Sequence, residues 1–302
     1  MNRYAFAFIT LGFIWGTNFL FMKWATPYLN ANQIVLFRVV TGFIAVFIYA
    51  ISKREIKLNH VKYTHHFFVM SLLATYIYYF CFAKGTEFLP SGIAGALSGA
   101  IPIFSAFLSV LFLKNESLSK MKVLGILFGL FGVVLIAKPW TALLTSLNMN
   151  GVVYMLAGSF SLGASFVYAK KFLSNVSIAP AALTTYQLLI ASILALSFGE
   201  INGITSITND FVTFIGVVVG LGLLGTGIAY IFYYMIVSKL GAMIASTVTY
   251  IPPVVAMLIG SFMVNESISL LHWSGMLMIL IGVIVMNNKF SSIKYLSNKR
   301  KT

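Results

Sequence analysis

The sequence predicts an all-α membrane protein with ten transmembrane helices, arranged as two inverted five-helix repeats. Of its 302 residues, 60% are hydrophobic and only 9% are charged, and the mean hydropathy is +0.95. Soluble domains usually carry about a quarter charged residues. Residues 101–133 recur 150 positions later, with fourteen of 33 aligned positions identical where chance would give about three. Each copy contains an odd number of apolar segments, so the second copy must enter the membrane in the opposite orientation.

The candidate spans follow one another with short connections. A helix needs about twenty apolar residues to cross a bilayer. Five such segments lie in the first repeat, residues 1–140, at 4–24, 33–51, 66–88, 92–113 and 121–138. Five more lie in the second repeat, residues 141–302, at 151–169, 179–198, 211–236, 242–263 and 271–288. The first segment has no small-residue cleavage site, so we expect a retained helix rather than a signal peptide.

The basic residues predict the orientation of the chain. With the N-terminus inside, sixteen of the twenty Lys and Arg residues fall on the cytoplasmic side, including a basic C-terminal tail. This asymmetry is typical of a cell-membrane protein with both termini in the cytoplasm. The net charge of +14 therefore reflects membrane orientation, and we expect the lipid bilayer rather than nucleic acid as a partner. The single cysteine, Cys81, excludes an intramolecular disulfide framework.

Several motifs occur at matching places in the two copies. The first span contains the run from Phe13 to Phe19, and the second contains Arg38. Ile101 and Pro102 open the repeated stretch, which includes the Asn-Glu-Ser run at 115–117. In the second copy the pattern returns at 163–166, 251–252 and 265–267, and Gln187 stands where Arg38 stood. Together these residues resemble the drug/metabolite transporter superfamily, in its ten-helix EamA-type branch.

The resemblance implies a secondary transporter of small polar metabolites, with amino acids as one candidate class, that works by alternating access around a cavity between helices 1, 3, 4, 6, 8 and 9. A multidrug or lipid-linked cargo exporter is the alternative. Related small multidrug exporters use a first-helix carboxylate for proton antiport, and this first helix has no Asp or Glu. Facilitated diffusion, exchange or another coupling stays open. We expect a monomer with a small-molecule substrate.

An enzyme is not expected. The sequence has no Gly-rich phosphate loop, no nucleophile elbow and no paired carboxylates within the spans. A membrane enzyme acting on lipids would need clustered His, Asp or Glu near one surface, and the four histidines and six acids are scattered. A sensor or assembly factor is a further alternative. We therefore predict no catalytic residues, no metal site and no cofactor.

Small and hydroxyl-bearing residues form stripes on two predicted helices. Ser98 and Pro102 belong to a stripe on the fourth span, and Ser165 and Tyr168 belong to one on the sixth. Such stripes suit either close helix packing or a polar cavity wall. Pro102 and Pro252 occupy equivalent places, where each is expected to kink its helix. Matching interruptions in two halves point to a transporter's binding site, and a packing kink is the other interpretation.

Polar and aromatic residues near mid-membrane are the other cavity candidates. Trp15 and Asn18 lie one turn apart on the first helix, and an asparagine facing lipid is costly, so Asn18 either lines the cavity or bonds a neighbouring helix. Tyrosines of the third and eighth spans add further candidates, while some tyrosines there must be lipid-facing or interfacial anchors. The candidates are Tyr78, Tyr79, Tyr230 and Tyr234.

Two basic residues inside predicted helices require separate explanations. The resemblance implies that the second helix is peripheral, so for Arg38 we favour a structural role, such as bonding carbonyls at a helix end. Lys84 either contacts an anionic group of the substrate or extends to the outer interface and pairs with Glu87, three residues on. Glu116 and Glu266 are expected to help begin the helix that follows each of them.

Overall fold

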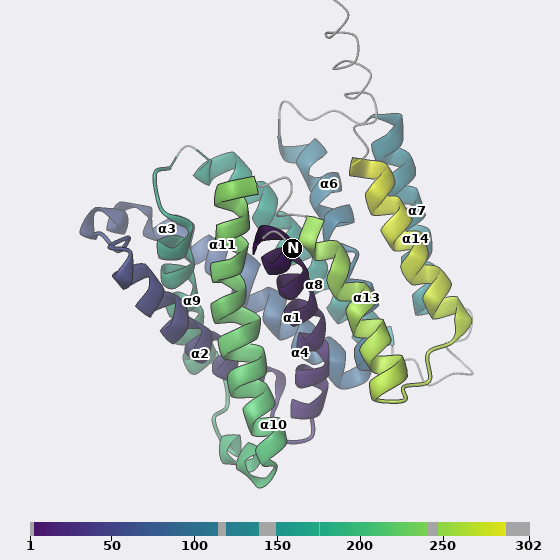
Figure 1. Cartoon of the computed structure of the whole chain (residues 1–302), viewed down its shortest axis with the longest axis horizontal. Coiled ribbons are helices and arrows are strands. Elements are labelled where there is room, and N and C mark those ends of the chain that lie inside the picture. The colour runs from purple at the N-terminus through teal and green to yellow at the C-terminus, as the bar shows by residue number, and fades with distance from the viewer. Residues whose placement is uncertain (1–2, 114–118, 139–148, 175, 241–246, 288–302) are drawn as a thin grey trace, which may run out of the picture.

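The computed structural model describes residues 3–113, 119–138, 149–174, 176–240 and 247–287, and all regular elements in these ranges are helical (Figure 1). Eight helices there are long and apolar enough to cross a membrane. Two further apolar helices, Val248–Met263 and Leu270–Met286, are shorter. The predicted all-α class is therefore confirmed. The first five residues of the predicted span 242–263 lie outside the described ranges. Residues 139–148, between the two halves, and the basic tail from 288 lie outside them too.

In the first half, the helices follow the predicted spans closely. Their bounds are α1 (Arg3–Ala25), α2 (Ala31–Ser52), α3 (Thr64–Ser71), α4 (Ile77–Phe88), α5 (Ser91–Ser98), α6 (Ile101–Phe112) and α7 (Lys120–Ala137). A 3₁₀ turn, η1 (Leu58–Tyr63), precedes α3, and a π-helical turn, η2 (Leu72–Tyr76), joins α3 to α4. Asn30 begins α2 with a capping box, in which its side chain accepts from Gln33 N at 2.9 Å and Gln33 Oε1 accepts from Asn30 N at 3.0 Å.

The described residues of the second half are likewise built from helices. Their bounds are α8 (Met149–Tyr168), α9 (Pro180–Phe198), α10 (Phe211–Ile215), α11 (Ala229–Leu240), α13 (Ile251–Leu258) and α14 (Leu270–Asn287). The shorter elements between them are η4 (Ala169–Leu173), η5 (Ile204–Asn209), η6 (Gly216–Ile228), η7 (Val248–Tyr250) and η8 (Ile259–Met263). The π-helical η6 was not expected from the sequence, and it packs along α2. Stretches of π-helix often occur at functional sites.

The fourth predicted span is interrupted instead of kinked. α5 ends at Ser98 and α6 begins at Ile101, so Pro102 lies in the first turn of a new helix. Pro252 likewise lies in the first turn of α13. A proline is tolerated there because the backbone N–H that it lacks would have no intrahelical partner. Each proline thus lies at the start of a helix rather than within one.

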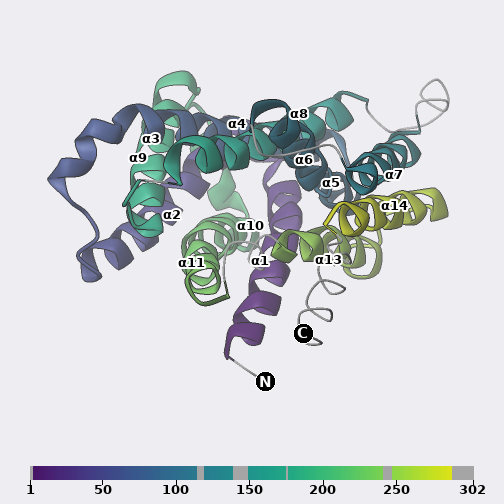
Figure 2. The ribbon, with the colours of Figure 1, turned by 90° about the horizontal axis from the view of Figure 1, so that it is seen from above.

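α7 and α14 pack in close backbone contact (Figures 1 and 2). A Cβ atom at Gly125 would lie 2.4 Å from the carbonyl oxygen of Gly282, and one at Gly132 would lie 2.5 Å from the carbonyl oxygen of Gly275. No larger residue fits at these positions without moving the helices apart. Since the residue numbers rise along one helix as they fall along the other, the two helices are antiparallel.

Glu266 corrects an expectation from the sequence. Its carboxylate does not begin the following helix but caps α5, a helix of the first half. Oε1 accepts from Ser91 N and from Ser91 Oγ, each at 2.7 Å, and Oε2 accepts from Gly92 N at 2.8 Å. A carboxylate at a helix N-terminus satisfies donors that have no intrahelical partner and interacts favourably with the helix dipole. Glu116 lies outside the described residues.

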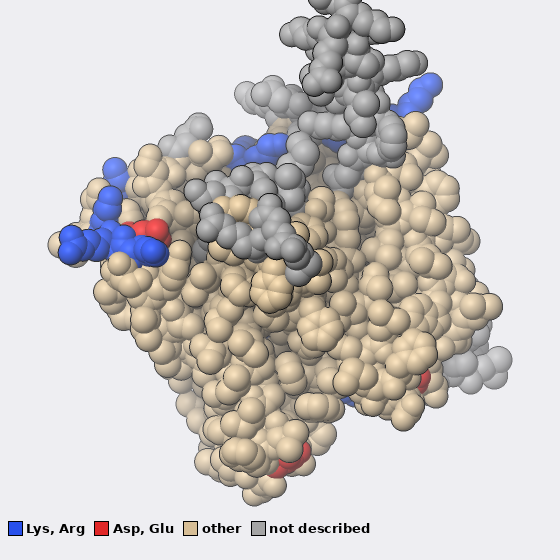
Figure 3. Space-filling view, in the orientation of Figure 1, with Lys and Arg blue, Asp and Glu red and all other residues tan. Residues whose placement is uncertain are grey.

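Charged side chains gather at the ends of the bundle. In the space-filling view, Lys and Arg lie along the upper edge and the upper left, and the described residues visible in the middle of this face are neither acidic nor basic (Figure 3). Large apolar side chains are exposed instead, among them Phe13, Ile48 and Leu127. A surface of this kind suits lipid rather than water.

Candidate functional site

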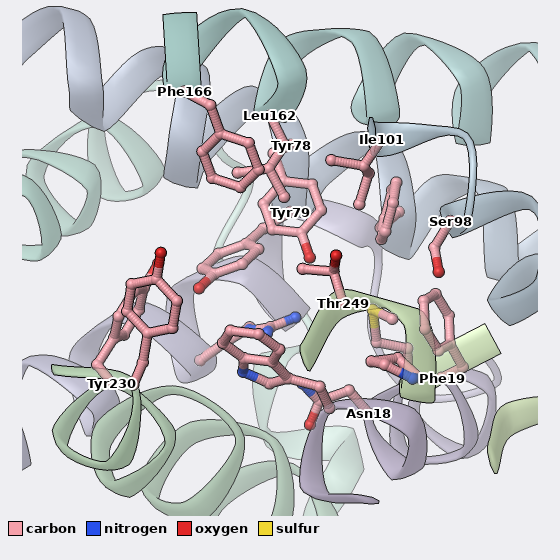
Figure 4. Close-up of a pocket in the computed structure, with 16 residues that line it drawn as sticks. Asn18, Phe19, Tyr78, Tyr79, Ser98, Ile101, Leu162, Phe166, Tyr230 and Thr249 are labelled. Atoms are coloured by element: carbon pink, nitrogen blue, oxygen red, sulfur yellow. The ribbon is translucent and has the colours of Figure 1, made fainter. Parts of the chain in front are cut away.

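A cavity lies at the centre of the bundle, and both halves of the chain contribute to its lining (Figure 4). Its volume is about 110 Å³, enough for several water molecules. The close-up shows side chains from α1 and α8 on opposite sides of a common space, with those of α4 and Thr249 between them. The lining consists of Trp15, Asn18, Phe19, Met22, Arg38, Tyr78, Tyr79, Phe82, Ser98, Ile101, Leu162, Phe166, Tyr230, Tyr233, Thr249 and Pro252.

Seven of the residues selected from the sequence lie in this lining. They come from five different helices, which explains why spacing along any one helix could not group them. The seven are Trp15, Asn18, Tyr78, Tyr79, Ser98, Tyr230 and Pro252. Aromatic rings form much of the wall: the Tyr78 and Phe82 centroids lie 4.5 Å apart, and those of Trp15 and Tyr233 lie 5.9 Å apart.

Three other candidates lie away from the central cavity. Ser165 is fully buried, and its hydroxyl donates to the carbonyl of Leu162 at 2.7 Å. The hydroxyl of Tyr168 lies 2.7 Å from Nδ1 of His66, which bonds α8 to α3. Pro102 lines a second cavity instead. For Tyr234, the structure describes the backbone of α11 but not the side chain.

Lys84 is also outside the cavity lining. Its Nζ lies 2.8 Å from Glu87 Oε2, and the two side chains are 30% and 38% exposed. This is the alternative in which the lysine pairs with Glu87 across one turn of the helix. Lys84 therefore has a partner of opposite charge within its own helix, while the cavity obtains its positive charge from another residue.

That residue is Arg38, for which the sequence favoured a structural role. Its side chain is only 3% exposed, and its guanidinium carbon lies 3.7 Å from the centroid of the Tyr79 ring. Nε donates to Thr226 Oγ1 at 3.0 Å. With the Asn18 amide turned so that both its ends are satisfied, Nη2 donates to the Asn18 oxygen at 3.1 Å. A charge at this depth is by default a functional candidate, and this signal was available in the sequence.

A matching contact occurs in the other half, but without a charge. Gln187 of α9 donates from Nε2 to Thr75 Oγ1, as Arg38 of α2 donates to Thr226 Oγ1. Both Gln187 and Thr75 are buried. The hydrogen bond between these helices can therefore be made by an uncharged amide.

A second cavity, of about 320 Å³, adjoins the first. Phe166 and Thr249 belong to the lining of both. The second cavity continues past Pro102, Ser105 and Ser109 of α6 to the basic residues Lys122 and Lys170. The serine stripe on the fourth span therefore lines two successive spaces, with Ser98 in the central cavity and the later serines in the second.

The chemistry of the central cavity is that of a binding site. Arg38 is the one charged residue among the described residues that line it. In the same described ranges, no three His, Cys, Asp or Glu side chains gather closely enough to hold a metal ion. Hydroxyl groups, an amide and aromatic faces complete the lining, which suits a small ligand with polar and apolar parts.

Comparison with known proteins gives matches along nearly the whole chain. The EamA-like transporter family matches residues 2–138 and again 149–288. An "Uncharacterized transporter" of Archaeoglobus fulgidus is 26% identical over 289 residues, covering 96% of this chain and 100% of that protein. The "Uncharacterized transporter YoaV" of Bacillus subtilis is 24% identical over 298 residues, covering 97% and 100%.

The "Uncharacterized inner membrane transporter YedA" of Escherichia coli K12 is 28% identical over 204 residues, which is 65% of this chain and 62% of that protein. A solved crystal structure has the same fold, with a TM-score of 0.62 at 17% identity, over 94% of this chain and 96% of the other. With its apolar helices, the chain is a multi-pass membrane protein, and it belongs to the EamA-like transporter family.

Proposed function

We propose that this protein is a secondary transporter that moves a small polar metabolite across the cell membrane by alternating access, with amino acids as one candidate class. The observation that carries the proposal is the central cavity, which is lined from both halves and adjoins a second cavity at Phe166 and Thr249. A buried binding space with a route toward one end of the bundle is what alternating access requires.

Two reciprocal contacts support ten spans arranged as inverted repeats, residues 1–140 and 141–302. Gly125 packs on Gly282 and Gly132 on Gly275, and a shift of 150 positions exchanges the two pairs. The Arg38–Thr226 and Gln187–Thr75 bonds exchange in the same way to within one residue. A two-fold axis in the membrane plane produces such reciprocity. Under this symmetry, a contact between one residue of the first half and one of the second is repeated between their equivalents in the opposite halves.

The size of the cavity favours a small metabolite over a lipid-linked cargo. A volume of about 110 Å³ has room for several water-sized groups, which suits a small molecule rather than a lipid-linked one. The described lining contains no carboxylate, so a cationic drug would find no counter-ion there. Protein flexibility can enlarge the space, but it cannot provide a charge that the lining lacks.

Transport can be tested in proteoliposomes. Uptake and efflux of a panel of anionic, zwitterionic, neutral and cationic metabolites would be measured with and without a pH gradient. We expect saturable transport of at least one small polar compound. Cysteines placed at Trp15 or Asn18, with Cys81 replaced, should react with small water-soluble thiol reagents and be protected by that compound. Absence of transport across the panel, with both cysteines unreactive in a folded protein, would exclude this function.

Orientation is a separate part of the proposal. With both termini in the cytoplasm, reporters fused after Arg54, after Lys171 and at the C-terminus should read as cytoplasmic, and one near Asn202 as external. The basic residues in the loops support this arrangement. A cytoplasmic reading near Asn202 would contradict the inverted-repeat topology.

A further inference from the structure

We infer that Arg38 binds a carboxylate group of the substrate in the central cavity. This inference rests on the proposed transport function and names the chemical class of the substrate. It is based on the position of Arg38 in the cavity lining, on the partners of its guanidinium and on the uncharged residue that makes the equivalent contact in the other half.

The first step concerns the electrostatic environment of Arg38. Its side chain is 97% buried, since only 3% is exposed, and no acidic side chain of the described residues lies within ion-pair distance of it. Its partners, Thr226, Asn18 and the Tyr79 ring, carry no net charge. A buried cation with only neutral partners is costly, and an anion bound beside it reduces that cost.

The second step concerns geometry. Tyr79 covers one face of the guanidinium, while Nε and Nη2 are used by Thr226 and Asn18. These bonds occupy two of the five N–H donors of an arginine, and the others have no acceptor among the described residues. Arg38 belongs to the cavity lining, and its remaining N–H groups are the donors that it can offer to a ligand there. Paired N–H donors of this kind match the two oxygens of a carboxylate.

The third step concerns the reason for a charge at this position. If bonding a threonine on the neighbouring helix were the only role of this position, glutamine would serve, as Gln187 does on Thr75. The central cavity includes Arg38 but not Gln187. The positive charge is therefore placed at the one of the two equivalent positions that reaches the cavity.

The charge balance selects a carboxylate over a phosphate. Arg38 supplies a single positive charge, and the described lining has no second basic residue. A carboxylate carries one negative charge, whereas a phosphate monoester carries about −1.5 to −2 at neutral pH. The aromatic wall formed by Tyr78, Phe82 and Trp15 suits the less polar part of the molecule.

The test measures binding in detergent, independently of transport. In a variant that keeps Trp15 as the single tryptophan, with Trp24, Trp140 and Trp273 replaced by phenylalanine, its fluorescence reports on the cavity. Carboxylates from acetate to octanoate would be titrated at constant ionic strength, each beside its neutral amide, with chloride and inorganic phosphate as further probes. We expect saturable changes with one or more carboxylates, and at least tenfold weaker responses to the matching amides.

Arg38→Gln is the matched variant, because it reproduces the residue of the other half and can keep the bond to Thr226. It should weaken carboxylate binding by about ten- to a hundredfold, the loss expected for a charge-assisted hydrogen-bonded pair. Arg38→Lys keeps the charge but not the paired donors. Its affinity for carboxylates should lie between that of Arg38→Gln and that of the parent protein. If Arg38→Gln does not fold, the comparison of carboxylate and amide in the parent together with Arg38→Lys still decides the question.

Equal responses to carboxylates and amides, responses to phosphate or chloride alone, or unchanged binding in folded Arg38→Gln would each overturn the inference. These outcomes differ from a failure of the proposed function. Transport of neutral solutes with no carboxylate preference would refute the role of Arg38 alone. Carboxylate binding at Arg38 without transport of any solute would refute the transport function and leave the binding site in place.

Discussion

Glu266→Gln is expected to destabilise the protein from the N-terminus of α5. The carboxylate of Glu266 accepts three hydrogen bonds, two from backbone N–H groups of Ser91 and Gly92 and one from the Ser91 hydroxyl, at 2.7 to 2.8 Å. Glutamine keeps the shape but replaces one acceptor oxygen with an NH₂ group. That group cannot accept, so at least one donor at the start of α5 loses its partner.

The magnitude follows from those contacts. Loss of a hydrogen bond to a charged group costs about 1.5–3 kcal/mol, and loss of the charge at a helix N-terminus costs about 0.3–1 kcal/mol more. Because Glu266 is half-buried, water partly replaces the lost bond, and we take about 2 kcal/mol for the total. For a chain of this size, this corresponds to a Tm lower by roughly 4–6 °C.

The assay is the fraction of monodisperse protein that remains in detergent after heating, read by size-exclusion chromatography. Glu200→Gln is the control, because Glu200 also lies in a loop but is exposed, and no hydrogen bond to its carboxylate occurs among the described residues. Ser91→Ala combined with Glu266→Gln should not cost the sum of the two single changes, because the Ser91 hydroxyl and the Glu266 carboxylate share a hydrogen bond and the two sites are therefore coupled. Equal Tm values for the Glu266 and Glu200 variants would refute the capping role.

Three further predictions concern helix packing, Phe166 between the two cavities, and the Lys84–Glu87 ion pair. Gly132→Ala should lower the free energy of unfolding by about 1–3 kcal/mol, because its Cβ would lie 2.5 Å from the Gly275 carbonyl oxygen. Gly216→Ala is the control: its Cβ would meet the Phe21 ring at 3.0 Å, and it should have a smaller effect in the same heating assay. Phe166→Ala should join the two cavities and increase thiol labelling of a cysteine at Asn18, and unchanged labelling would contradict a constriction at Phe166. Lys84→Met should change the transport rate of the identified substrate by less than about fivefold, since an exposed ion pair contributes at most about 1 kcal/mol, and a larger loss would restore Lys84 as a substrate contact.

The fold class could be predicted because it depends on properties that are local in the sequence. Runs of about twenty apolar residues mark helices, and the Gly and Pro positions mark their interruptions. The place of Pro102 was identified, but its effect was not, since a proline in a first turn and a proline within a helix look alike until the neighbouring helices are placed. The π-helical stretch at 216–228 has no comparable signal, because its hydrogen bonds depend on packing against α2.

The cavity was only partly predictable because its residues meet through long-range contacts. Trp15 and Tyr230 were identified because a polar aromatic group in mid-membrane needs a polar partner or a wet space. Glu266 bonds Ser91 and Gly92, which are 175 and 174 positions away, so no local pattern indicated the contact. Phe166 was missed because a phenylalanine in an apolar helix has many possible neighbours, and only the structure places it between two cavities.

Arg38 and Lys84 show why depth and partners, rather than charge alone, distinguish a functional residue in a membrane helix. Lys84 is 30% exposed beside Glu87, and its charge costs little at the end of the bundle. Arg38 is buried among neutral partners inside the bundle, where a charge without a counter-ion is costly. The glutamine at the equivalent position makes the same kind of bond without that cost. The cost of burying a charge at Arg38, and not at the equivalent Gln187, is explained if the charge binds an anion. The central cavity is where an anion would reach Arg38.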